Sequence, residues 1–153
     1  MRNGAVDFGF VNPEAAKGLE TQILKSDFFV AVFAKNSPLA QKGSVSLQEL
    51  KEAPYLLLEE GCYSEPLEAF RRERIETNIR MSLHDDYSIL SMVERGLGYS
   101  ILAELMLQKT SYEVEVCPIK EKIVRTMALV TKDKREISVA AKTFMRFVLK
   151  NVK

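Results

Sequence analysis

The chain of 153 residues is long enough for one ordinary domain or for two small lobes. Apolar residues make up 46% of it and charged residues 28%, which is typical of a globular protein and excludes the disordered, fibrous and disulfide-rich classes. The 22 Lys and Arg residues balance 21 Asp and Glu residues, so the chain as a whole has no basic footprint for nucleic acid or an anionic membrane.

The first third of the chain predicts strands and turns. Residues 5–11 form a β-branched and aromatic run that ends at a turn, which predicts a strand. Residues 27–33 are nearly all apolar and predict a strand covered on both faces, with a short strand or a connection at 19–24. Ser46 and Glu49 have the spacing of a capping box, which predicts a short helix.

The middle third alternates strands with helices. Residues 55–58 predict a buried strand, and Ser64 is a candidate N-cap for a helix that runs to about Ile75. Residues 79–83 alternate apolar and polar side chains, which predicts a half-buried strand. Asp85 or Asp86 then caps a further helix, whose apolar face consists of Ile89, Leu90, Met92 and Val93.

Two glycines follow that helix. Gly96 is placed to end it in a left-handed conformation, and Gly98 lets the chain turn closely into a strand at 99–102. Residues 103–109 predict a helix, 114–116 and 124–130 predict strands, and Ser138 caps a final helix. This alternation predicts an α/β architecture with parallel strands.

Several phrases of the sequence, in this order and at these spacings, resemble the effector-binding domain of LysR-type transcriptional regulators. They are Gly4–Phe10, Phe29–Phe33, Ser37–Ala40, Val45–Leu50 and Ile89–Leu102. The resemblance implies an α/β fold of two lobes, similar to the type 2 periplasmic binding proteins, with a small-molecule site between the lobes.

The same resemblance implies a division of the chain. Lobe I would hold residues 1–30 and 124–153, and lobe II residues 31–123. In the family, a winged helix-turn-helix, a linker helix and the opening elements of lobe I precede the strand at 8–10. They are absent from this sequence, so lobe I is expected to be incomplete, and DNA contact is expected only through the missing domain. The final helix face, with Phe144, Phe147 and Val148, would then lack part of its cover.

An effector site of this family resembles a cleft where helix N-termini and backbone N–H groups meet a small, often anionic ligand. Two helix starts of lobe II and one strand end of lobe I are candidates, with a floor from the strand that follows Gly98. The predicted effector-binding residues are Phe10, Val11, Asn12, Gly61, Cys62, Tyr63, Ser64, Asp86, Tyr87, Ser88, Tyr99 and Ser100.

Plainer interpretations of these residues stay open. Ser64 is also an ordinary N-cap, and Asp85 and Asp86 are also caps, whose charge would disfavour a nearby carboxylate and leaves an amine-bearing or neutral effector open. Cys62 is a small packing residue, with redox sensing as the alternative. His84 is a surface or hydrogen-bonded residue.

Motifs of catalysis are not found. The sequence contains no G-x-S-x-G, G-x-x-x-x-G-K-[ST] or H-E-x-x-H phrase, and the basic run at 71–74 is interpreted as a solvated helix face. Its two cysteines match no metal-ligand spacing. We therefore expect a binding module and not an enzyme, with no cofactor and no metal.

The expected partners are a small-molecule effector, of the amino acid or small organic acid class, and a second copy in a homodimer or higher oligomer. With neither a signal peptide nor an apolar run long enough to cross a bilayer, a cytoplasmic protein without membrane contact is expected. The alternative function is a stand-alone interaction or dimerisation module, a regulator remnant without ligand sensing. A periplasmic solute-binding protein is disfavoured because a signal peptide is missing.

Overall fold

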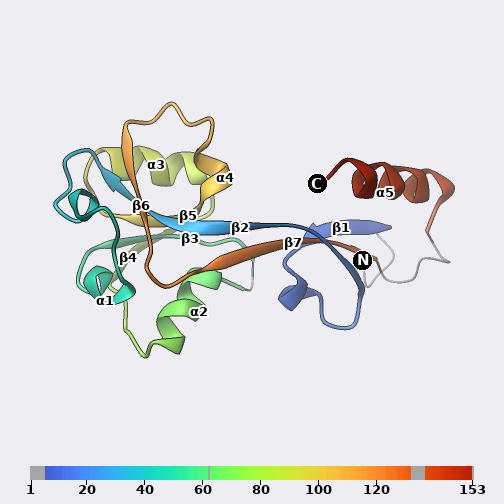
Figure 1. Cartoon of the computed structure of the whole chain (residues 1–153), viewed down its shortest axis with the longest axis horizontal. Coiled ribbons are helices and arrows are strands. Elements are labelled where there is room, and N and C mark those ends of the chain that lie inside the picture. Colours follow the sequence, from blue (N-terminus) through green and yellow to red (C-terminus); the bar gives the residue numbers. More distant parts are fainter. Residues whose placement is uncertain (1–5, 62, 132–136, 153) are drawn as a thin grey trace. The chain divides into compact units, whose positions relative to one another are not determined.

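The computed structural model describes residues 6–61, 63–131 and 137–152. The chain divides into two compact units (Figure 1). Unit 1 consists of Met1–Ser26 and Arg125–Lys153, and unit 2 of Asp27–Val124. Two strands, β2 (Glu20–Ala34) and β7 (Val124–Thr131), carry the chain from one unit to the other.

Unit 1 is built on strand β7. Strand β1 (Phe8–Val11) pairs with it antiparallel, with Phe8 opposite Thr131, and the first part of β2 lies on its other side. Successive side chains of a strand point to opposite faces, and both faces of β7 are covered. Leu129 packs on the side of helix α5 (Val139–Asn151), and its neighbours Ala128 and Val130 pack with Ala16 of the 3₁₀ turn η1 (Pro13–Ala16).

Unit 2 contains a mixed sheet. The second part of β2 pairs antiparallel with β5 (Ser100–Ala103) and with β6 (Val114–Pro118). Strands β3 (Tyr55–Leu58) and β4 (Ile79–Leu83) form a parallel pair, which joins β5 through a parallel bridge between Tyr55 and Tyr99. The 3₁₀ turn η2 spans Ala40–Lys42.

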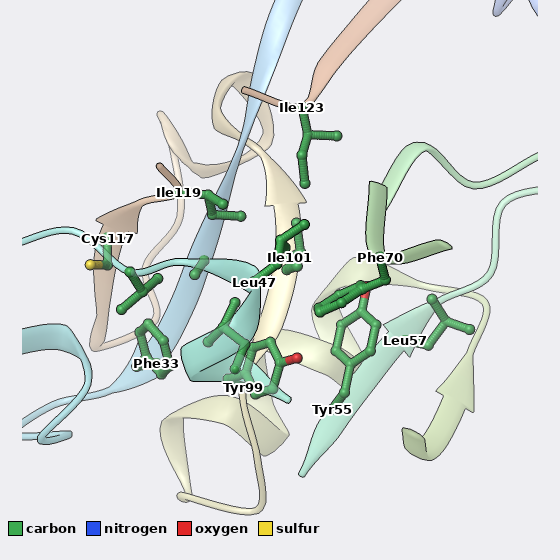
Figure 2. Packing of buried hydrophobic residues seen from close by; sticks show 13 residues of the cluster. Phe33, Leu47, Tyr55, Leu57, Phe70, Tyr99, Ile101, Cys117, Ile119 and Ile123 are labelled. Atoms are coloured by element: carbon green, nitrogen blue, oxygen red, sulfur yellow. The ribbon is translucent and has the colours of Figure 1, made fainter. Parts of the chain in front are cut away.

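Helices cover both faces of this sheet, with α3 (Asp86–Glu94) and α4 (Glu104–Leu107) on one side and α1 (Leu47–Leu50) and α2 (Glu65–Arg72) on the other (Figure 1). On the α1 and α2 side a row of aromatic rings fills the core (Figure 2). The ring centroids of Phe33 and Tyr99 are 5.8 Å apart, those of Tyr99 and Tyr55 5.1 Å, and those of Tyr55 and Phe70 6.1 Å. Aromatic pairs at these separations add to the stabilisation from apolar burial.

The local signals of the sequence are confirmed. Ser46 forms the expected capping box with Glu49, Ser64 caps α2, Asp85 caps α3 and Ser138 caps α5. Gly96 takes φ +73 after α3, as expected for a left-handed helix end. Because each of these features depends on residues within a single turn, short-range patterns were enough to predict them.

Three expectations about the strands are only partly confirmed. The segments at 19–24 and 27–33 belong to one strand, β2, of which only Val30–Phe33 is fully buried. Parallel pairing holds for β3 with β4, whereas β1–β7, β2–β5 and β2–β6 are antiparallel. Strand β4 pairs with β3 alone and has no strand on its other side in this sheet. Ile79 and Met81 are therefore 43% and 44% exposed, although they alternate with polar residues.

Candidate ligand-binding site

A pocket of about 330 Å³ lies in unit 2 where β3 leads into α2. Strands β3 and β4 run parallel and end side by side, with Leu58 opposite Leu83, so the pocket begins at their carboxyl ends. Parallel strands of α/β proteins present their ligand sites at this end. The lining residues are Leu57, Leu58, Glu59, Glu60, Gly61, Tyr63, Ser64, Leu67, Glu68 and Arg71.

The loop before α2 is shaped by a glycine and a cap. Gly61 takes φ +75, a backbone conformation that side chains disfavour. The Ser64 hydroxyl accepts a hydrogen bond from the Leu67 N–H at 3.4 Å, so the N-cap interpretation of Ser64 is confirmed. Because Ser64 also lines the pocket, capping does not remove it from the surface that a ligand would contact.

Two oppositely charged side chains of α2 that line the pocket, Glu68 and Arg71, are bonded to each other. The Glu68 carboxylate accepts hydrogen bonds from Nε and Nη2 of Arg71 at 2.9 and 2.8 Å. This pair of hydrogen bonds, more than the Coulomb attraction of Arg71 and Arg72, lowers the pKa of Glu68 below its usual value. The Arg71 guanidinium is therefore already engaged by a carboxylate of its own helix.

The second predicted helix start lies at the same end of the strand pair. The Glu59 N–H donates to the Leu83 carbonyl at 2.8 Å, and His84 Nδ1 lies 3.3 Å from the Glu59 carbonyl, so the loops after β3 and β4 are joined. Asp85 accepts from the Ser88 N–H at 2.8 Å, and this backbone hydrogen bond lowers the Asp85 pKa. His84 is thus hydrogen-bonded, as expected.

The residues Asp86, Tyr87 and Ser88 follow this loop but do not line the pocket that contains Ser64. Tyr87 is mostly exposed. The structure therefore brings the two helix starts to one end of the β3–β4 pair, and builds the pocket around the first of them.

Tyr99 and Ser100 lie elsewhere in unit 2. Tyr99 pairs with Tyr55, the first residue of β3, and therefore lies at the amino end of the parallel strands, whereas the pocket begins beyond Leu58. The buried Ser100 hydroxyl donates to the Leu56 carbonyl at 2.7 Å. Tyr99 lines a separate hollow with Phe33, Pro38 and Gly98, so neither residue forms the floor of the Ser64 pocket.

The remaining predicted residues are in unit 1 or outside the described residues. Phe10 and Val11 end β1, where Val11 lies opposite Ala128. The Asn12 side chain accepts from the Glu14 N–H at 2.8 Å and caps η1. Cys62 lies outside the described residues, so the structure does not test its packing or redox role.

Sequence reasoning missed the charged wall of the pocket. The sequence predicts a solvated helix face for the basic run at 71–74, yet Arg71 lines the pocket together with Glu68. The signal that could have found them is helical spacing, since Ser64, Leu67, Glu68 and Arg71 stand at i, i+3, i+4 and i+7 and so share one face.

Over the described parts of the chain, three or more His, Cys, Asp and Glu side chains nowhere gather closely enough to hold a metal ion. Within the same described residues, no helix has the length and apolar character that crossing a membrane requires.

The model of the LysR substrate binding domain family matches residues 1–153, and the chain therefore belongs to this family. Among curated proteins it is 27% identical to the uncharacterized HTH-type transcriptional regulator MJ0300 of Methanocaldococcus jannaschii, over 98% of this chain and 53% of that protein. It is 31% identical to the uncharacterized HTH-type transcriptional regulator YfeR of Shigella flexneri, over 92% of this chain and 47% of that protein. The chain thus spans about half the length of the curated relatives that it matches.

Solved structures agree with the fold. The regulatory domain of Synechocystis CcmR, in complex with 2-PG, matches all of this chain and 76% of its own with a TM-score of 0.88 at 21% identity. The effector binding domain of QuiR, in complex with shikimate, matches 99% of this chain and 74% of its own with a TM-score of 0.82 at 27% identity. The α/β fold of the effector-binding domains of LysR regulators is therefore confirmed, and the family is one of regulators and not of enzymes.

Proposed function

We propose that this chain senses a small-molecule effector within a LysR-type transcriptional regulator. The effector would be an amino acid or small organic acid, and the chain would divide into lobe I (1–30 and 124–153) and lobe II (31–123). The pocket around Ser64, at the carboxyl ends of β3 and β4, is the observation that supports this proposal. The effector binding domain of QuiR, which is 27% identical to this chain, was solved in complex with shikimate.

Sensing requires that the effector bind one arrangement of the protein more tightly than another. In the whole regulator the preferred arrangement would change the contact of a DNA-binding domain with DNA, in a homodimer or higher oligomer. We also propose Phe10, Val11 and Asn12 of lobe I as effector-binding residues. The alternative, an interaction module without ligand sensing, has less support because two solved relatives are complexes with small molecules.

Isothermal titration of the chain with amino acids and small organic acids, shikimate included, tests the proposal. The variant Ser64→Thr retains an N-cap hydroxyl and adds one methyl group to the pocket wall, so it should weaken effector binding with little change in stability. Ser46→Thr makes the same change at the cap of α1, away from the pocket, and is the matched control.

Binding that is equal in Ser64→Thr and Ser46→Thr would remove the Ser64 pocket from the site. If no compound binds or raises the melting temperature at concentrations far above plausible dissociation constants, ligand sensing by this chain is refuted.

A further inference from the structure

Unit 1 contains a pocket of about 350 Å³, which no part of the proposed function uses. Its volume is within the range of roughly 300–1,000 Å³ that is typical of small-molecule sites. It lies between β2 and α5 and is lined by Gln22, Ile137, Lys142, Met145, Arg146 and Leu149. All six residues belong to unit 1, whereas the Ser64 pocket is formed wholly by unit 2.

The helix wall of this pocket is a single stripe. Lys142, Met145, Arg146 and Leu149 stand at i, i+3, i+4 and i+7 of α5 and therefore share one face. Met145 is buried, as is Ile137 just before the helix, whereas Leu149 is 39% exposed at the rim. The pocket thus has an apolar floor and an open apolar edge, onto which a hydrocarbon group would fit.

The charged side chains that line this pocket are all cations. Lys142 and Arg146 are cations and none of the six lining residues is acidic. The Arg146 Nε–H donates to the Lys142 carbonyl at 3.4 Å, which holds the guanidinium next to the Lys142 backbone. A guanidinium and an ammonium one helical turn apart favour a carboxylate or phosphate group. In the Ser64 pocket, by contrast, three glutamates accompany one arginine.

On the β2 side of the pocket, Gln22 has a side-chain oxygen that accepts no hydrogen bond from the described residues. Oε1 of Gln22 is shielded from solvent, and no residue in the described ranges donates a hydrogen bond to it. Leaving a buried acceptor unpaired costs free energy that a bound hydroxyl or amine would recover. Because Gln22 lines the pocket, a donor group on a ligand is the partner that this geometry accommodates.

We propose that this pocket binds a small amphipathic anion, a compound with a carboxylate or phosphate for Lys142 and Arg146, an apolar body for Met145 and Leu149, and a hydroxyl or amine donor for Gln22. It is a second ligand site, separate from the effector pocket at Ser64, on the unit that carries α5.

The test uses three compounds that differ in one group each, titrated into the ¹⁵N-labelled 153-residue chain and followed by the NMR shifts of its backbone amides. Mandelate has a carboxylate, a phenyl ring and a hydroxyl. Phenylacetate lacks the hydroxyl, and 1-phenyl-1,2-ethanediol has no charge. We expect mandelate to shift the amides of Gln22 and of residues 142–149, phenylacetate to bind more weakly, and the diol to leave these amides unshifted.

Two variants complete the test, a double variant that removes both pocket cations and a control that removes a cation outside the pocket. Lys142→Gln with Arg146→Gln should weaken mandelate binding about tenfold or more, since charge-assisted hydrogen bonds are lost. Lys150→Gln removes an exposed cation from the same helix outside the pocket and should leave binding unchanged. Amide shifts elsewhere in unit 1 confirm that each variant remains folded.

Several results would overturn the proposal. They are binding of the diol as tight as that of mandelate, binding by the double variant equal to that of Lys150→Gln, or no shifts at millimolar mandelate. Shifts confined to residues around Ser64 would likewise assign the anion to the effector pocket and refute the second site, while leaving the proposed function intact.

Discussion

Gly98 packs directly on the backbone carbonyl of Pro54, so closely that a Cβ atom at position 98 would overlap the Pro54 oxygen. The same oxygen accepts a hydrogen bond from the Tyr99 N–H at 2.9 Å. This contact brings the turn after α3 against the start of β3. Close backbone approach of this kind is available only to glycine.

Gly98→Ala should therefore destabilise the fold through overpacking, by about 1–3 kcal/mol or more, because the obstacle is backbone and not a flexible side chain. Gly43→Ala is the control, since Gly43 has a positive φ but no atom within 4 Å of the position that a Cβ would take. Its cost is that of the left-handed conformation alone, about 1 kcal/mol. Urea unfolding measures both variants, and a Gly98→Ala cost no larger than that of Gly43→Ala would contradict the close contact.

Glu49 makes stability depend on pH in acid. Its carboxylate accepts hydrogen bonds from Lys42 Nζ at 2.7 Å and from the Ser46 N–H at 2.8 Å, and Lys120 Nζ lies 3.3 Å away. The hydrogen bond from Lys42, followed by that from Ser46, lowers the pKa of Glu49 from 4.5 to about 2. A carboxyl with a lowered folded-state pKa stabilises the fold above its unfolded pKa and loses this contribution as pH falls through the folded value.

The stability difference between the wild type and Glu49→Gln should accordingly be constant at neutral pH, shrink below pH 4.5 and vanish near pH 2. Glu52→Gln is a control, because among the described residues Glu52 forms an ion pair only with Lys51, at 3.7 Å, and its side chain is almost fully exposed. Urea unfolding across this pH range gives both curves. A difference that persists unchanged at pH 2 would show that Glu49 does not titrate in this way.

Tyr55 has an inward-pointing hydroxyl that lacks a partner among the described residues. The variant Tyr55→Phe removes the hydroxyl and its desolvation cost, and it retains the ring contacts with Tyr99 and Phe70. We expect the variant to match or exceed the wild type in stability, by up to about 1–3 kcal/mol, the usual cost of an unsatisfied buried polar group. A loss of stability in thermal unfolding would mean that the hydroxyl has a bound water as its partner.

The same burial affects alkaline pH. Desolvation, followed by repulsion from Tyr99, raises the pKa of Tyr55 above its ordinary value of 10, and desolvation raises that of Tyr99 to about 12. The unfolded chain therefore loses these protons at lower pH than the folded one, and stability falls as pH rises above 10. Tyr55→Phe should lose less stability than the wild type between pH 10 and 12, and equal slopes of the two stability curves in this range would contradict the burial of the phenol.

The local parts of the fold were predictable, because each depends on neighbouring residues. The caps Ser46, Ser64 and Ser138 accept hydrogen bonds from N–H groups three residues later, so their spacing carries the information. Part of the candidate site was predictable for the same reason. Gly61, Tyr63 and Ser64 line one pocket because a strand end, a turn and an N-cap follow one another directly.

The order of strands in the sheets was not predictable from periodicity. A period of two shows that buried and exposed side chains alternate along a strand, but it does not show which strands are neighbours. This is why Tyr99 and Ser100 were expected beside Ser64, although the parallel bridge of Tyr99 with Tyr55 places them at the other end of the strands. It is also why Ile79 and Met81 were expected to be half-buried. Their alternation is real, but β4 has a neighbour on one side only in its sheet.

The position of β4 can be tested by one substitution made at two isoleucines. Ile101 in the central strand β5 is 1% exposed and packs in the core cluster with Phe33 and Tyr99, whereas Ile79 on β4 is 43% exposed. Ile101→Ala should cost about 2–5 kcal/mol, through lost transfer free energy and the cavity left behind. Ile79→Ala leaves no enclosed cavity and should cost about 1 kcal/mol or less. Equal losses of unfolding free energy in urea would show that β4 is covered in solution, so that Ile79 belongs to an interface and not to a free edge.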